Sequence, residues 1–209
     1  SNTYIGGTAG AGATTGSHNT GIGRDVLGVT DTASDNTAVG SSALYNIISG
    51  DANVSMGRQA GVGITTGDGN IAVGFQTMFG VGTGDDNIAI GYKAGYSITG
   101  ASENTIVGSY AGDALTDGNY NTAIGAYALS EESNGEENVA IGFRALAAQS
   151  GAEFNTVVGY SAADSVVGST GLTAVGHSTA TNVTGDELTF IGIGAGDGAA
   201  YSGRNNTAI

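Results

Sequence analysis

The chain of 209 residues contains no cysteine, no proline and no tryptophan, and only 5 Lys and Arg stand against 19 Asp and Glu. The absence of cysteine excludes a disulfide-stapled module, a thiol nucleophile and a cysteine zinc site. The net charge of −14 argues against a nucleic-acid partner, because the phosphate backbone would be repelled. With 40% apolar and 11% charged residues, the composition is not that of a disordered chain. No apolar run reaches about 18 residues, so we expect a protein that is not embedded in a membrane.

Glycine, in contrast, is abundant, with 39 of 209 residues, and it follows a fixed period. The segment Asn-x-x-(Ile/Val/Met)-Gly ends at Gly6 and Gly23, 17 residues apart, and keeps this step as far as Gly176. Gly192 comes one residue early, and Asn206 opens a last, unfinished copy. Twelve repeats and a fragment therefore fill residues 1–209 as a single repeat domain. Because the chain stops within a motif, we expect it to be an excerpt of a longer fibre chain.

The repeat predicts an all-β fold, a parallel β-solenoid of twelve 17-residue coils. A unit of this length is too short for two helices, and its β-branched Thr-Ala-Ile core is cut by glycine. We expect each coil to contain a strand, a glycine corner, a second short strand and a second glycine corner. Stacked about 4.8 Å apart, twelve coils form a rod about 60 Å long. The absence of proline agrees with strands that are paired on both sides.

Counting positions from the asparagine, alternation within the strand predicts two different faces. We expect the Ile, Val and Met side chains of position 4, together with position 2, to form the core of the coil. Positions 3 and 5 are nearly always Ala or Gly and would face a neighbouring chain that approaches closely. Burial on both sides indicates side-by-side association of chains.

Position 1 predicts a structural ladder of asparagine side chains that bond from coil to coil at a corner. Its recurrence in nearly every coil favours this structural interpretation over a catalytic one. The predicted ladder consists of Asn36, Asn53, Asn70, Asn87, Asn104, Asn121, Asn138 and Asn155.

The string Asn-Thr-Ala-Ile-Gly-x-x-Ala-Leu, present from Asn121 to Leu129, resembles two related repeats. One is found in the heads of YadA-type trimeric autotransporter adhesins, and the other in tail-fibre-like arrays associated with endosialidase-type chaperone domains. The resemblance covers essentially the whole chain. It implies a left-handed β-roll and a side-by-side homotrimer, in an extracellular fibre on a cell surface or a virion. The 17-residue period departs from the 14-residue adhesin repeat and fits the chaperone-linked arrays better.

Acidic and aromatic residues supply the candidate binding positions. Acidic residues concentrate in positions 10 to 17, which predicts a solvated acidic edge. The alternative interpretation is functional, a calcium site formed by Asp68, Asp85 and Asp86. Phe75, Phe79, Tyr92 and Tyr96 form a cluster that predicts either packing or a contact surface for a glycan or protein.

No constellation of catalytic residues emerges from the sequence, so we expect no enzymatic activity and no cofactor other than calcium. The residues favour a structural and adhesive fibre segment that associates with itself and presents a surface to a host glycan or protein. An ice- or crystal-binding solenoid is one alternative, since Thr recurs at position 2. The non-catalytic part of a polysaccharide-binding tailspike is another.

Overall fold

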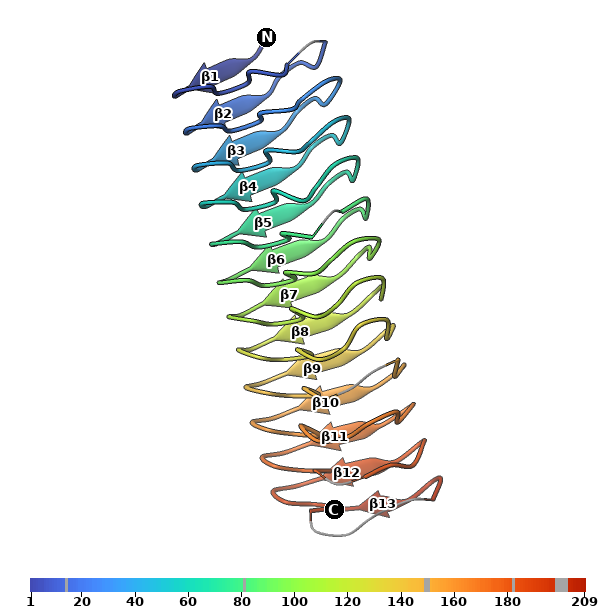
Figure 1. Cartoon of the computed structure of the whole chain (residues 1–209). Coiled ribbons are helices and arrows are strands. Elements are labelled where there is room, and N and C mark those ends of the chain that lie inside the picture. The colour runs from blue at the N-terminus through green and yellow to red at the C-terminus, as the bar shows by residue number, and fades with distance from the viewer. Residues whose placement is uncertain (14, 81, 149–150, 182, 198–202) are drawn as a thin grey trace.

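The computed structural model describes residues 1–13, 15–80, 82–148, 151–181, 183–197 and 203–209. Thirteen strands stack in chain order into one parallel sheet, and the coils rise as a rod from the N-terminus to the C-terminus (Figure 1). The prediction of an all-β parallel solenoid of about twelve turns is confirmed. The strands are Thr3–Ile5 (β1), Thr20–Ile22 (β2), Thr37–Val39 (β3), Val54–Met56 (β4), Ile71–Val73 (β5), Ile88–Ile90 (β6), Thr105–Val107 (β7), Thr122–Ile124 (β8), Val139–Ile141 (β9), Thr156–Val158 (β10), Thr173–Val175 (β11), Thr189–Ile191 (β12) and Thr207–Ala208 (β13).

Equivalent residues of successive coils pair directly, because the repeat length is nearly constant. Thr3 pairs with Thr20, and Ile5 with Ile22. The shortened eleventh repeat keeps the register, with Thr173 opposite Thr189. Equal repeat positions therefore lie above one another, so each column of the repeat becomes a column on the rod, although the residue type varies in places, as where Ala89 pairs with Ile106. In the part of the chain that the structure describes, no helix is long and apolar enough to cross a membrane.

The glycine of position 5 ends each strand for two physical reasons. At Gly91 the backbone has φ +140°, a conformation that L side chains rarely adopt. A Cβ atom placed there would also lie 2.5 Å from the carbonyl oxygen of Gly108 in the next coil. The coils therefore stack closely at this corner only if every copy is glycine.

The rest of each coil consists of tight turns, so the expected second strand was wrong. Outside the named strands, the described residues contain only isolated bridge positions, such as the bridge between Ile64 and Gly82. Positions 7, 9 and 17 adopt left-handed conformations, as Lys93 (φ 53°), Leu44 (φ 47°) and Glu103 (φ 58°) show. These residues bend the backbone repeatedly and prevent a second extended segment.

The side chains of the strand face the opposite way from our expectation. Position 3 points into the coil, where Ala38, Ala89 and Ala123 are fully buried. Position 4 points outward, and Ile90 and Ile124 keep 39% of their surface exposed. The prediction that position 4 forms the core was therefore wrong, and so was the prediction that position 3 meets a neighbouring chain. The coil is flat, so it has room for a small side chain from the strand against Ala and Leu from the turn segment.

In several coils the sizes of the residues at positions 3 and 9 complement each other in the interior. Where position 3 is Ala, as at Ala38, position 9 is often Leu, as at Leu44, and both are fully buried. Where position 3 is the buried Phe190, position 9 is Gly196, and a Cβ there would lie 2.6 Å from the phenyl ring. This pairing of large with small residues is how a tightly packed core tolerates substitution.

Candidate binding edges of the rod

Asparagine side chains form a buried ladder along one corner of the rod. At Asn87, the Oδ1 atom accepts hydrogen bonds from the backbone N–H and the Nδ2 atom of Asn104, at 3.1 and 3.0 Å. Its own Nδ2 donates to Asn70 Oδ1 at 3.0 Å and to the backbone oxygen of Ala101 at 2.7 Å. The pattern repeats in neighbouring coils, so each amide connects the coils on both sides of it and also closes its own coil. The buried column contains Asn19, Asn36, Asn53, Asn70, Asn87, Asn104, Asn121, Asn138 and Asn155.

The predicted calcium residues take part in a second, exposed ladder at position 16. The backbone N–H of Asp51 donates to Asp68 Oδ1 at 2.7 Å, and that of Asp68 donates to Asp85 Oδ1 at 2.8 Å. Asp86 lies at a left-handed corner (φ 55°), where its N–H donates to the carbonyl of Asp68 at 2.9 Å. The carboxylates of Asp68 and Asp85 thus already bind backbone donors.

Within the described ranges, no group of three or more His, Cys, Asp or Glu side chains is placed to hold a metal ion. The calcium site therefore stays a prediction without a formed ligand cluster.

Aromatic rings form a long stack on the opposite edge of the rod, at positions 6 and 7. Of the four predicted contact residues, Phe75 stacks on Tyr92, with centroids 5.4 Å apart, and Phe79 stacks on Tyr96, at 5.1 Å. The first of these pairs continues through four more aromatic residues to a histidine, one ring in each coil. The whole series is Phe75, Tyr92, Tyr110, Tyr127, Phe143, Tyr160 and His177.

The predicted cluster covers only two coils, because the aromatic residues at positions 6 and 7 lie in separate columns of the repeat. The structure joins them, since a ring at either position reaches the same edge. The signal available in the sequence was one aromatic residue at position 6 or 7 in each coil from Phe75 to Tyr160.

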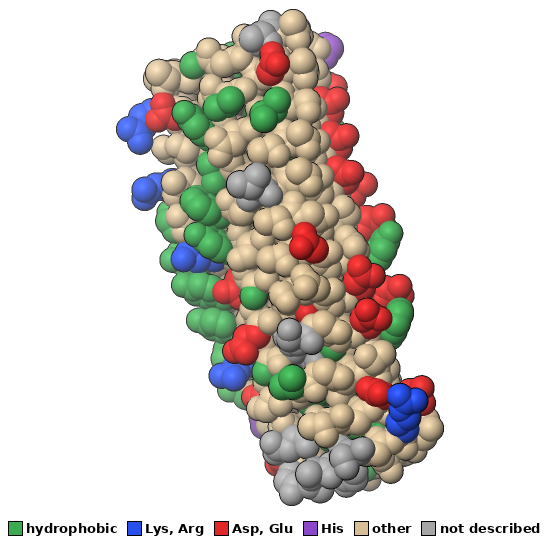
Figure 2. All heavy atoms as spheres, turned by 45° about the vertical axis from the view of Figure 1, so that its right-hand side comes forward, with side chains coloured by type: hydrophobic (Ala, Val, Ile, Leu, Met, Phe, Trp, Pro, Cys, Tyr) green, Lys and Arg blue, Asp and Glu red, His purple; other side chains and the backbone are tan. Residues whose placement is uncertain are grey.

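Basic side chains lie on the same edge as the rings. The guanidinium of Arg58 lies 5.6 Å from the ring centroid of Phe75. Lys93 Nζ lies 4.9 Å from the ring centroid of Tyr96 and 5.9 Å from that of Tyr110. Figure 2 shows most basic side chains and a band of hydrophobic ones along one edge, with a few acidic ones among them, and most acidic side chains along the other edge. The rod is therefore polarised across its width, although its net charge is strongly negative.

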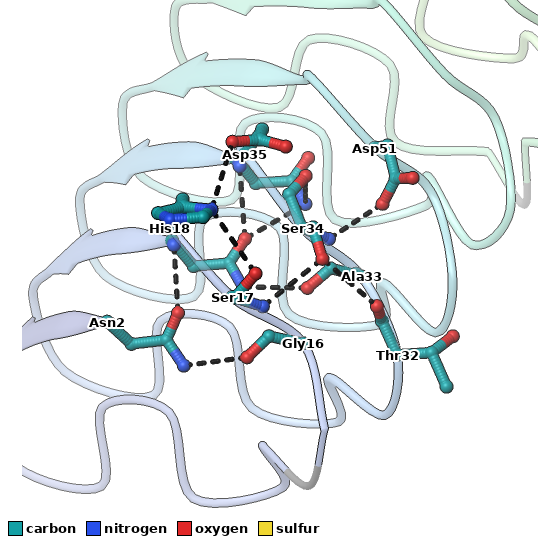
Figure 3. A network of polar contacts seen from close by, with 11 residues as sticks. Asn2, Gly16, Ser17, His18, Thr32, Ala33, Ser34, Asp35 and Asp51 are labelled. Atoms are coloured by element: carbon teal, nitrogen blue, oxygen red, sulfur yellow. Dashed lines mark hydrogen bonds and ion pairs between the residues drawn. The ribbon is translucent and has the colours of Figure 1, made fainter.

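The first coils bring together a serine, a histidine and an aspartate, a group that the sequence did not predict (Figure 3). Ser17 Oγ lies 3.2 Å from His18 Nδ1, and Asp35 Oδ1 lies 3.6 Å from the same nitrogen. A catalytic triad needs the serine on one ring nitrogen and the carboxylate on the other. The side chains of His18 and Asp35 are also 66% and 64% exposed. The geometry is thus that of exposed polar neighbours and does not activate the serine.

No protein-family model, no curated protein and no solved structure matches this chain.

Proposed function

We propose that the chain is a structural and adhesive segment of an extracellular fibre, a rigid β-solenoid that associates with copies of itself as a homotrimer. The observation that supports this most is the outward face of the sheet. Thirteen in-register strands present positions 2 and 4 to solvent along the whole rod, and position 4 is Ile, Val or Met in every complete coil. A long row of partly exposed Ile, Val and Met side chains, beside a position 2 that is mostly Thr, is typical of a surface that another molecule covers.

A second copy of the chain is the occupant that we favour for this face. Two such faces have the same strand spacing, so side chains of one rod can fit between those of another along the full length. Symmetric association of identical chains is also the common way to cover such a surface. The glycines of position 5 end each strand without a protruding side chain, which lets the edges of the face approach closely.

Native mass measurement with one pair of variants tests the association. Ile90→Asp places a charge in the outward face, where Ile90 is 39% exposed, and is expected to give monomers. The control is Ile193→Asp, because Ile193 is 87% exposed at position 6, outside the sheet face. It should stay trimeric. A wild-type chain that is monomeric at micromolar concentration would contradict the proposal.

An ice- or crystal-binding rod is the second candidate, and one observation favours it. Thr residues of position 2, such as Thr20 and Thr122, share the outward face with the Ile and Val residues of position 4. A monomeric rod therefore presents regularly spaced hydroxyl and methyl groups on a flat surface. An ice-recrystallisation assay on the monomeric Ile90→Asp variant and on wild type separates this function from self-association.

Calcium is a further part of the proposal that a direct measurement tests. If Asp68, Asp85 and Asp86 bind the ion, the melting temperature should rise with added calcium and fall with EDTA. An unchanged melting temperature in both conditions would remove the site.

A further inference from the structure

A small open hollow lies on the aromatic edge, between the coils that contain β8 and β9. Its volume is about 170 Å³. It is lined by Tyr127, Ser130, Glu131, Phe143, Arg144 and Ala147. None of these residues belongs to the contact cluster that the sequence predicted.

The hollow coincides with a break in the aromatic stack. Tyr110 and Tyr127 stack at 9°, and Phe143 and Tyr160 stack at 21°, so these rings cover each other's faces. Tyr127 and Phe143 instead meet edge to face, at 77° and 6.1 Å between centroids. In such a pair the ring that presents its edge does not have its face covered by its partner. At this break one ring face is therefore not covered by the neighbouring ring, and both Tyr127 and Phe143 line the hollow.

The other edge-to-face step of the stack has a cation beside both of its rings. Tyr92 and Tyr110 meet at 61°, and Lys93 Nζ lies 5.9 Å from both ring centroids. Arg144 occupies the same repeat position as Lys93, but its Nε atom lies 3.9 Å from Asp164 Oδ2. The chain's own cation covers the first break, while at the second break Arg144 is a wall of the hollow.

The polar groups around the hollow limit the ligand chemistry. Arg144 supplies N–H donors, Glu131 supplies carboxylate acceptors, and Ser130 supplies a hydroxyl group. Because Arg144 also faces Asp164, acidic groups outnumber basic ones here, and together with the net charge of −14 this disfavours an anionic ligand. A volume of about 170 Å³ is below that of drug-sized pockets and accommodates about one six-membered ring.

We propose that this hollow binds one neutral hexopyranose residue of a glycan. An apolar C–H face of the sugar lies on the uncovered ring of Tyr127 or Phe143, and its hydroxyl groups bond to Arg144 and Glu131. The assignment rests on the proposed role as a surface-exposed adhesive segment. The proposed site lies at the break in the stack, and not at the stacked pairs of Phe75 and Phe79 that the sequence predicted as the contact surface.

Saturation-transfer NMR on the whole chain tests this site, with methyl galactoside, methyl glucoside and methyl mannoside as probes and glucuronate as the acidic comparison. At least one neutral glycoside should receive saturation, strongest on the ring protons of one sugar face. Tyr127→Ala, Arg144→Gln and Glu131→Gln should each raise Kd about tenfold, the loss of one stacking or hydrogen-bonding contact.

Matched controls remove the same kinds of groups away from the hollow. Phe75→Ala takes one ring from the far end of the stack, and Arg58→Gln takes one cation from beside a ring; neither should change Kd. Circular dichroism confirms that each variant is folded, and the two polar variants test the site even if Tyr127→Ala unfolds. The absence of transfer to every neutral glycoside, equal losses in the controls or tighter binding of glucuronate would each overturn the proposal. Because native mass separately reports trimer formation, a failure of the fibre proposal is distinguishable from a failure of the sugar site.

Discussion

Replacement of Asn87 by alanine measures what the buried amide ladder contributes to the rod. The substitution removes the acceptor of the Asn104 backbone N–H and the donor to the Ala101 carbonyl, at 3.1 and 2.7 Å. Within the described residues, neither of these two backbone groups makes another hydrogen bond. Each buried group left unpaired costs about 1–3 kcal/mol, so we expect Asn87→Ala to lower the free energy of unfolding by about 2–6 kcal/mol.

Two further variants separate hydrogen bonding from volume and charge. Asn87→Leu fills the space, as Leu172 and Leu188 do in the natural column, but leaves the same two groups unpaired. It should therefore destabilise the chain nearly as much as alanine does. Asn87→Asp replaces the Nδ2 donor by an acceptor that faces the oxygens of Asn70 and Ala101, and should destabilise the chain more.

Urea denaturation followed by circular dichroism gives the decrease in the free energy of unfolding. Hydrogen exchange shows which coils are destabilised, because coils of a repeat protein open locally. Exchange should accelerate most in the coils of Asn87 and Asn104. The control is Asn46→Ala, since Asn46 is only half-buried and donates one side-chain bond, to Val62 O at 2.9 Å. A loss below about 1 kcal/mol for Asn87→Ala, or one no greater than that of the control, would refute the reasoning.

Three other predictions concern a corner, a buried charge and a pH dependence. Gly91→Ala should lower the free energy of unfolding, measured by urea denaturation, by about 3 kcal/mol or more. The alanine would have to adopt φ +140° and would place its Cβ atom 2.5 Å from a carbonyl oxygen. Gly7→Ala, where a Cβ meets nothing within 4 Å, should change stability by about 0.5 kcal/mol or less. Glu132→Leu should lower the free energy of unfolding by about 2–5 kcal/mol, because the fully buried carboxylate accepts three backbone N–H bonds of 2.7–3.0 Å, and a neutral effect would contradict this role. Burial raises the pKa of Asp113, so the folded state binds more protons than the unfolded state and stability falls as pH rises from about 4 through that raised pKa. Asp113→Asn should flatten this part of a melting-temperature profile against pH and raise stability at neutral pH, and an unchanged profile would count against the assignment.

The aromatic edge shows which features of the candidate site can be predicted from the sequence. Rings at position 6 or 7 in successive coils are visible in the printed sequence, and in-register stacking places them on one edge. Ring orientation is not visible there, because it depends on rotamers that neighbouring rings and cations select. The edge-to-face meeting of Tyr127 with Phe143, and the hollow beside it, therefore emerged only from the structure.

The sequence by itself determined the architecture, because a 17-residue period with glycine at position 5 and asparagine at position 1 allows little other than stacked parallel coils. It also predicted the asparagine column, since a polar side chain that recurs in nearly every coil must find its hydrogen-bond partners in the neighbouring coils. Only the tertiary structure decided which face of the strand is inside. Alternation defines two faces but gives no direction, and small residues suit a crowded interior as well as a close interface. The flat coil resolved this by burying Ala38 against Leu44 and turning the larger Ile and Val side chains outward.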